Sequence, residues 1–226
     1  MPELHRWDLP PAEAKALQQE LAGRVKLQPL PATFNVLGAA DIGYSSATNQ
    51  LVAVMVTFRW PDLGHIESAH VVTPVTFPYI PGLLSFREVP ALLEAHRRLQ
   101  YPPDVLICDG QGIAHPRKFG LASHLGLCLE TPTIGCAKKL LCGKHDEVGI
   151  ERGSAALLRH RDEAVGWVFR SRTGVKSIYI SPGHLSDLES SKELICRCLG
   201  RFRIPEPARQ AHNLATRLRQ ALSSPS

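Results

Sequence analysis

One stretch, residues 105–118, most constrains the fold of this chain. Four apolar residues, Val105 to Cys108, are typical of a buried strand, and the next residue is Asp109. Glycines, a histidine and two cations follow directly. An α/β protein brings a charged group to the carboxyl edge of its sheet in this way, and ligands bind at that edge. Asp109 is therefore either a catalytic or metal-binding acid or a turn cap, because Asp-Gly is also an ordinary turn signal.

Length and composition favour one α/β domain over residues 1–226. The chain is long for one domain and short for two, and its 44% hydrophobic and 21% charged residues are typical of a soluble globular protein. No apolar run approaches the roughly 20 residues that a membrane span needs, and the N-terminus lacks the apolar core of a signal peptide. We therefore expect a cytoplasmic protein that does not bind membranes.

Cysteine spacing and net charge narrow the classes of site and partner. The six cysteines form no C-x-x-C pair and several lie in apolar runs, which favours reduced core thiols over a zinc site or a disulfide framework. The net charge of +5 is compatible with a polyanionic partner without requiring one.

Residues 35–75 predict an antiparallel meander of three strands. The first, residues 35–41, is a run of small apolar residues that ends on Asp41, and residues 51–58 and 65–75 follow after tight turns. If the strand at 105–108 lies parallel beside the first strand, Asp41 and Asp109 become neighbours. The predicted fold class is α/β, with a mixed sheet in which parallel strands extend the meander and helices flank it.

The remaining elements are predicted from apolar periodicity and turn residues. We expect further strands at residues 133–136, 164–169 and 177–180, and a polar excursion at residues 143–160. We expect helices at residues 11–25, 85–99, 119–129, 181–199 and 208–222.

The loop before the second predicted helix is stiffened by two prolines. Pro78 and Pro81 fix φ on either side of Tyr79 and Ile80, and Gly82 follows. Two interpretations stay open. The loop is either a rigid turn that packs Tyr79 into the core, or a wedge that inserts an apolar side chain between bases and unstacks them.

Acidic and basic residues are predicted to converge on one sheet edge. Glu88 either completes a capping box opened by Ser85 or lies in the first helical turn beside Asp41 and Asp109. Three crowded carboxylates repel one another unless a dication neutralises them, and such oxygen ligands suit Mg²⁺ or Mn²⁺. A metal held in this way suits phosphodiester hydrolysis.

Three basic residues are open to a functional and to an ordinary interpretation. Lys138 and Lys139 follow the strand at 133–136, so they either face the acids or are surface lysines that open a loop. His212, on the last predicted helix, is compatible with an ordinary exposed residue.

Several motifs, in the same order, resemble the endonuclease V family of deoxyinosine 3′ endonucleases. The similarity covers nearly the whole chain, at residues 35–41, 78–88, 109–117, 132–139, 181–184 and 205–212. Ala208 stands where we expect threonine in the family pattern. The resemblance implies a ribonuclease H-like fold and a role in DNA repair. The implied reaction is Mg²⁺-dependent nicking at the second phosphodiester bond 3′ of hypoxanthine, the deaminated form of adenine, which leaves 5′-phosphate and 3′-hydroxyl ends.

The resemblance also assigns roles to residues. Asp41, Glu88 and Asp109 are the implied metal ligands, His212 completes the catalytic site, and Lys138 faces the phosphate. The implied substrate-binding residues are Pro78, Tyr79, Ile80, Pro81, Gly82, Gly110, Gly112, His115 and Lys139. Tyr79 is the implied wedge. The base is expected to flip into a pocket lined by residues 110–115, because hypoxanthine pairs weakly and must be recognised by its edge.

Three functional hypotheses follow. The leading one is a monomeric Mg²⁺-dependent endonuclease, with Mn²⁺ as a substitute, that acts on inosine-containing DNA. The second is a ribonuclease H-like nuclease that acts mainly on inosine-containing RNA or on branched or flap structures. The third is a non-catalytic nucleic-acid-binding protein. The three acids disfavour the third, since without a metal they repel phosphates.

Overall fold

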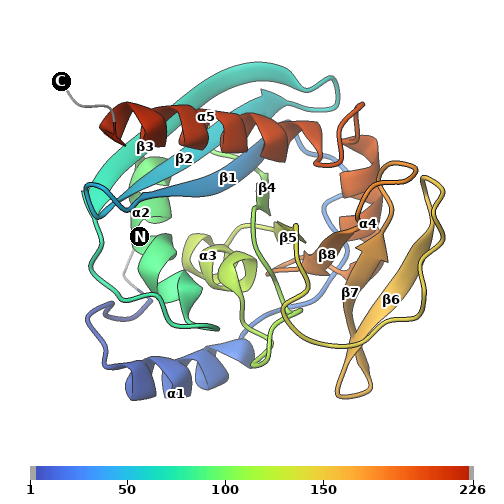
Figure 1. The fold of residues 1–226 in the computed structure, drawn as a ribbon, viewed down its shortest axis with the longest axis horizontal. Coiled ribbons are helices and arrows are strands. Elements are labelled where there is room, and N and C mark those ends of the chain that lie inside the picture. Colours follow the sequence, from blue (N-terminus) through green and yellow to red (C-terminus); the bar gives the residue numbers. More distant parts are fainter. Residues whose placement is uncertain (1–3, 224–226) are drawn as a thin grey trace.

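The computed structural model of the chain describes residues 4–223. They form one eight-stranded mixed sheet with helices packed against it (Figure 1). Residues 1–3 and 224–226 of the predicted domain lie outside the described part. The strands are β1 (Val36–Ser45), β2 (Gln50–Arg59), β3 (Gly64–Pro74), β4 (Val105–Cys108), β5 (Thr133–Ala137), β6 (Ala155–His160), β7 (Glu163–Phe169) and β8 (Ile178–Pro182). The helices are α1 (Pro11–Ala22), α2 (Leu84–Arg97), α3 (Leu121–Leu129), α4 (Leu188–Arg197) and α5 (Glu206–Ser223).

The strand order is β3-β2-β1-β4-β5-β8-β7-β6, and it confirms the predicted fold class. Strands β1, β2 and β3 form the antiparallel meander, and β4 and β5 extend it in parallel from β1. Beyond β5 the sheet continues with three antiparallel strands, β8, β7 and β6. The meander and the parallel strands therefore meet at β1 and β4, the two strands that carry the predicted acids.

Helices cover both faces of the sheet, and the alternation of strand residues decides which face each acid lies on. Ala40 of β1 packs with residues of α2 and α3, whereas Ala39 packs with residues of α5. Successive strand residues point to opposite faces, so Asp41 lies on the same face as Ala39. Helix α5 crosses this face of the sheet (Figure 1). This alternation is why the last helix can contribute to a site on the first strand.

The prediction that Asp41 ends its strand is wrong. Strand β1 continues to Ser45, because its pairing with β2 extends as far as Gln50. The parallel partner β4 is shorter and pairs with β1 only as far as Ala40. Asp41 is therefore the first residue of β1 beyond the parallel ladder, and its neighbourhood at the end of β4 is the predicted one.

The predicted capping box at the start of α2 is also wrong. The helix begins at Leu84, and its N-cap residue, Leu83, makes no side-chain capping hydrogen bond. Ser85 instead turns into the core, where its Oγ lies 3.0 Å from Nδ1 of His124. Glu88 is therefore not held by Ser85. It also does not lie in the first helical turn, as was the other prediction, because that turn contains no acidic residue.

Two predictions in the second half of the chain need correction. The predicted polar excursion at residues 143–160 ends in the edge strand β6. Most residues of β6 are solvent-accessible, so its sequence lacks the alternation of apolar and polar residues that predicts a strand. The helix predicted from Ser181 begins only at Leu188, because Ser181 and Pro182 pair with β5. Asp187 is its N-cap and accepts a hydrogen bond from the Ser190 amide at 2.8 Å.

All six cysteines are free thiols, as predicted, and Cys108, Cys136 and Cys198 are buried in the core. None of the helices within residues 4–223 combines the length and the apolar character needed to cross a membrane.

Candidate active site

Asp41, Asp109 and His212 come together beside the carboxyl end of β4, and we call them the acid cluster. One potential ligand atom from each lies within 4.8 Å of the others. The Asp109 amide donates to the carbonyl of Ala40 at 3.0 Å, which extends the β1–β4 pairing to this point. Nδ1 of His212 lies 2.7 Å from Oδ2 of Asp41 and 4.0 Å from Oδ2 of Asp109. The two aspartates are neighbours, as the sequence predicts.

Small residues on α5 bring His212 to this cluster. Ala208, Ala211 and Ala215 are buried and spaced along the stripe of the helix that faces the sheet. His212 lies four positions after Ala208 and shares that stripe. The approach is close, since a side chain on Gly43 of β1 would place its Cβ 3.1 Å from the Ala215 carbonyl oxygen. Although 47% of its side-chain surface is exposed, His212 is engaged with the acids.

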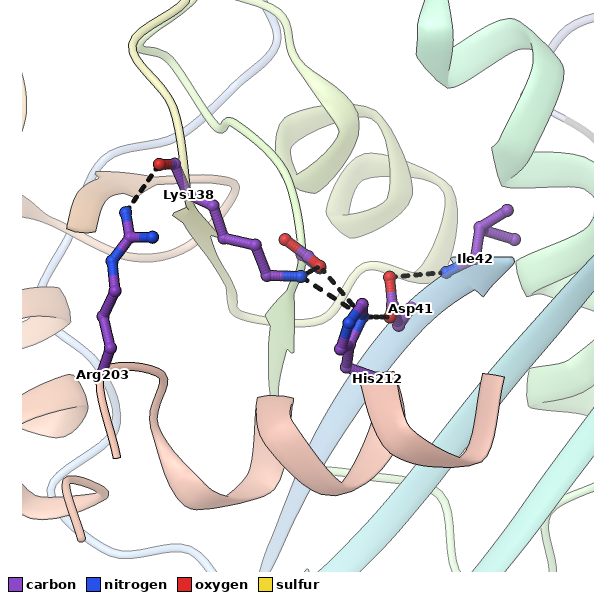
Figure 2. A network of polar contacts seen from close by, with 6 residues as sticks. Asp41, Ile42, Lys138, Arg203 and His212 are labelled. Atoms are coloured by element: carbon purple, nitrogen blue, oxygen red, sulfur yellow. Dashed lines mark hydrogen bonds and ion pairs between the residues drawn. The ribbon is translucent and has the colours of Figure 1, made fainter. Parts of the chain in front are cut away.

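The two lysines after β5 diverge. Nζ of Lys138 forms an ion pair with Oδ2 of Asp109 and lies 3.3 Å from Nδ1 of His212, whereas Lys139 is exposed. Figure 2 shows the Lys138, His212 and Asp41 side chains pointing toward one another. Arg203, which the sequence analysis did not single out, donates through Nη2 to the carbonyls of Lys138 and Ser177, each at 2.7 Å. Arg203 therefore holds the backbone from which Lys138 reaches the acids.

Electrostatics set this site apart from ordinary surface carboxylates. Burial, and then the charge of Asp109, raise the pKa of Asp41 to about 6, against the lowering effect of its His212 hydrogen bond and of Lys138. Burial, and then the charge of Asp41, raise the pKa of Glu88 to about 8. Glu88 lies outside the acid cluster but is near enough to be repelled by both aspartates. The three carboxyls outnumber the one nearby ammonium, that of Lys138, and the carboxylate and imidazole donors fit a divalent metal.

A cavity of about 440 Å³ lies beside the acid cluster, and Lys138, the ion-pair partner of Asp109, lines it. Seven of the nine predicted substrate-binding residues line it: Tyr79, Ile80, Pro81, Gly82, Gly110, His115 and Lys139. Pro78 and Gly112 are not among its lining residues. Gly112 instead packs on β8, where an added Cβ would lie 1.8 Å from the Pro182 carbonyl oxygen. Gly112 therefore packs against the sheet and does not face the cavity.

Tyr79 is 66% exposed at the rim of this cavity. The interpretation that packs it into the core is therefore wrong. Its loop is nevertheless anchored at Gly82, which has a φ of 80° that favours glycine. Nη2 of Arg117 donates to the Gly82 carbonyl at 2.7 Å, and Nε2 of His115 lies 3.1 Å from the same oxygen. The exposed tyrosine is thus carried by a loop whose C-terminal end is fixed at Gly82.

His115 is neutral in this arrangement. Burial, and then the charge of Arg117, lower its pKa to about 4. The Arg117 amide donates to Nδ1 at 3.2 Å, so the ring proton lies on Nε2 and is donated to the Gly82 carbonyl. The cavity wall therefore carries no imidazolium charge at neutral pH.

Gln18 completes the set of contacts that hold the Tyr79 loop, which we call the anchor. It was not predicted as a site residue. It is fully buried on α1, where its Nε2 donates to the Phe119 carbonyl at 2.6 Å and its Oε1 accepts from Nε of Arg117 at 2.5 Å. Its spacing from the buried residues Ala14 and Leu21 places it on the inward stripe of the helix. A glutamine on that stripe is the sequence signal for a buried polar role.

Comparisons with known proteins identify one family. The sequence model of the endonuclease V family matches residues 19–213. Endonuclease V of Azotobacter vinelandii is 46% identical over 211 residues, which cover 93% of this chain and 96% of that protein. The crystal structure of endonuclease V from Streptomyces avermitilis has a TM-score of 0.90 at 39% identity and covers 96% of each chain.

A more distant structure, Ciona intestinalis endonuclease V, has a TM-score of 0.83 at 24% identity over 93% of this chain and 97% of that chain, and it shares the fold. The family match and the 46% identical relative go further and confirm the resemblance seen in the motifs. The chain belongs to the endonuclease V family.

Proposed function

We propose that this nuclease recognises hypoxanthine in nucleic acid and nicks the second phosphodiester bond on its 3′ side, in DNA repair. The observation that carries the proposal is the shared wall between the acid cluster and the 440 Å³ cavity, of which Lys138 is part. A cavity of this size is large enough for a base. The Ciona intestinalis relative was crystallised with DNA that contains an inosine followed by a ribo-adenosine, which supports the choice of substrate.

Metal dependence is part of the proposal. Asp41 and Asp109 would hold a divalent cation, with Glu88 and His212 completing the site. Carboxylate oxygens suit Mg²⁺, and Mn²⁺ also accepts imidazole. When bound, the cation supplies Lewis acidity and a lowered pKa for a coordinated water. The Lys138 ammonium, next to Asp109, offers a fixed positive charge to the phosphate oxygens.

Base recognition would occur in the cavity after the nucleotide leaves the helix. Hypoxanthine pairs weakly, so its extrusion costs less than that of a normal base. Tyr79, exposed on its anchored loop, is placed to fill the gap in the stack. The neutral His115 and the side-chain oxygen of Gln111, which is buried without a hydrogen-bond partner among the described residues, supply polar character to the wall.

A mapped cleavage assay tests this function. Oligonucleotides with a single inosine, in DNA and in RNA, are compared with matched adenine, uracil, abasic and flap substrates, with Mg²⁺ or with EDTA. We expect Mg²⁺-dependent cleavage at the second phosphodiester bond 3′ of inosine, with 5′-phosphate ends. Equal rates on all substrates would remove the hypoxanthine claim. Absence of Mg²⁺ and Mn²⁺ binding by calorimetry, with and without DNA, would favour a non-catalytic binder.

A further inference from the structure

A second hollow, of about 500 Å³, adjoins the 440 Å³ cavity, which we call the base cavity. Residues 138–140 line both, so they form the partition between them. The cationic residues that line the hollow are Lys138, Lys139, Arg170, Lys176 and Arg203, and Glu147 is its one acidic lining residue. We call it the basic hollow. Apart from Lys138 and Lys139, its cations belong to neither the acid cluster nor the base cavity.

The sheet and two arginines build the basic hollow. Tyr179 of β8, a partly buried lining residue, pairs with Ala137 at the end of β5, so the hollow begins where β5 delivers Lys138. Arg170 donates to the carbonyls of Val148, Gly149 and Val175 at 3.1, 3.0 and 2.6 Å. Arg203 holds the Lys138 and Ser177 carbonyls. These guanidinium groups therefore fix the walls through backbone oxygens.

Three of the five cations of the hollow are left without a carboxylate partner in the described part of the chain. Within residues 4–223, Arg170, Lys176 and Arg203 form no ion pair with a carboxylate. The N–H groups of the two arginines donate to neutral backbone carbonyls instead. Lys176 is exposed in the turn between β7 and β8. A concave surface with several fixed cations concentrates positive potential and attracts polyanions.

We propose that the basic hollow binds the sugar-phosphate backbone of the inosine-containing strand, next to the flipped nucleotide. This inference rests on the proposed function, since only residues 138–140 separate the hollow from the cavity proposed to take the base. Five cations and one acid line the hollow, so its net charge is positive. This positive charge complements the negative charge of a nucleic-acid strand. The Tyr179 hydroxyl is a neutral donor to the same phosphates. Lys176 is the residue in which this site can be tested without touching the acids.

Salt dependence of binding gives the first test. The protein is titrated, in EDTA so that nothing is cut, with a duplex that contains one inosine. One lost phosphate contact lowers the salt slope by about 0.9, so the affinity advantage of the unchanged protein over Lys176→Ala should shrink about 3.5-fold between about 50 and about 200 mM salt. Lys176→Arg should keep the unchanged slope. Lys15→Ala, at an exposed position on α1, is the matched control and should also keep it.

Substrate truncation identifies the strand. Shortening one flank of the inosine strand should weaken binding of the unchanged protein but leave Lys176→Ala unaffected, because two changes that remove one contact are not additive. The proposal is overturned if the salt slope of Lys176→Ala is unchanged. It is also overturned if only truncation of the complementary strand abolishes the difference. Equal binding of inosine and adenine duplexes would instead reject base recognition, and the salt comparison on either duplex would still decide the role of the hollow.

Discussion

His212 and Asp41 lie 171 positions apart in the sequence, yet Nδ1 of His212 is 2.7 Å from Oδ2 of Asp41. The contact joins the last helix to the first strand, so the site exists only when the chain has folded from end to end. It also orients Asp41, whose other oxygen accepts from the Ile42 amide at 2.8 Å (Figure 2). A carboxylate fixed at both oxygens is preorganised to coordinate a cation.

Asp41→Asn is expected to abolish metal-dependent cleavage without unfolding the protein. Loss of residues that merely support a metal ligand costs 10- to 100-fold, so loss of a ligand should lower the rate by more than about 100-fold. Asparagine removes a buried charge beside Asp109, so the thermal midpoint without metal should not fall. Single-turnover cleavage and thermal unfolding measure the two effects. Asp146→Asn, at an exposed carboxylate, is the control, and a rate for Asp41→Asn equal to that of Asp146→Asn contradicts the assignment.

Glu88 should make the metal-free protein less stable as the pH rises. Its pKa is raised from 4.5 to about 8, so the folded state holds the proton more tightly than the unfolded chain does. The free energy of unfolding therefore decreases as the pH increases through this window, by on the order of 1 kcal/mol per pH unit. Glu88→Gln should flatten the dependence. Thermal unfolding in EDTA from pH 5 to pH 8 measures it, and an identical slope in Glu88→Gln rejects the assignment.

Added Mg²⁺ should restore stability most at the high end of that range. A cation competes with the protons of Asp41 and Glu88, so metal affinity should increase with pH up to about 8. Calorimetric titration across the same pH values checks this expectation. Metal affinity that is independent of pH would exclude both carboxyls as ligands.

The sequence predicts the proximity of the two aspartates because a parallel strand that follows the meander has few ways to align with β1. Each aspartate directly follows the apolar residues that pair between these two strands. It does not predict how α5 reaches them. The approach of His212 depends on three buried alanines and Gly43, which carry no signal for a site when read alone, and only the family resemblance implied it. The edge strand β6 was missed for a related reason, since most of its residues are solvent-accessible.

The anchor of the Tyr79 loop was missed because its parts are distant in sequence. Gln18 and Arg117 are 99 positions apart, and Arg117 and Gly82 are 35 positions apart. Side-chain hydrogen bonds of this kind depend on how α1 docks against the segment after β4. A buried glutamine on α1 indicates a polar partner but does not identify it.

Tyr79→Ala should separate binding from stability. Tyr79 is 66% exposed, so its truncation should cost less than about 1 kcal/mol of unfolding free energy, against the roughly 3–5 kcal/mol of a buried aromatic site. Affinity for an inosine-containing duplex should fall much more than affinity for an inosine-containing single strand, because only the duplex must be unstacked. Tyr101→Ala, at another exposed tyrosine, is the control. A stability loss in the buried range would contradict the wedge.

Arg117→Lys should weaken recognition of inosine through the loop it holds. Lysine keeps the charge but cannot serve both Gln18 and the Gly82 carbonyl, and an unpaired buried acceptor costs about 1–3 kcal/mol of stability. We expect a higher KM for inosine duplex with a smaller change in kcat. Arg172→Lys, at an exposed position in the turn that follows β7, is the control. Combining Arg117→Lys with Gln18→Leu should cost less stability than the sum of the single changes. Additive costs, or an unchanged preference for inosine over adenine, would show that the anchor does not position the loop.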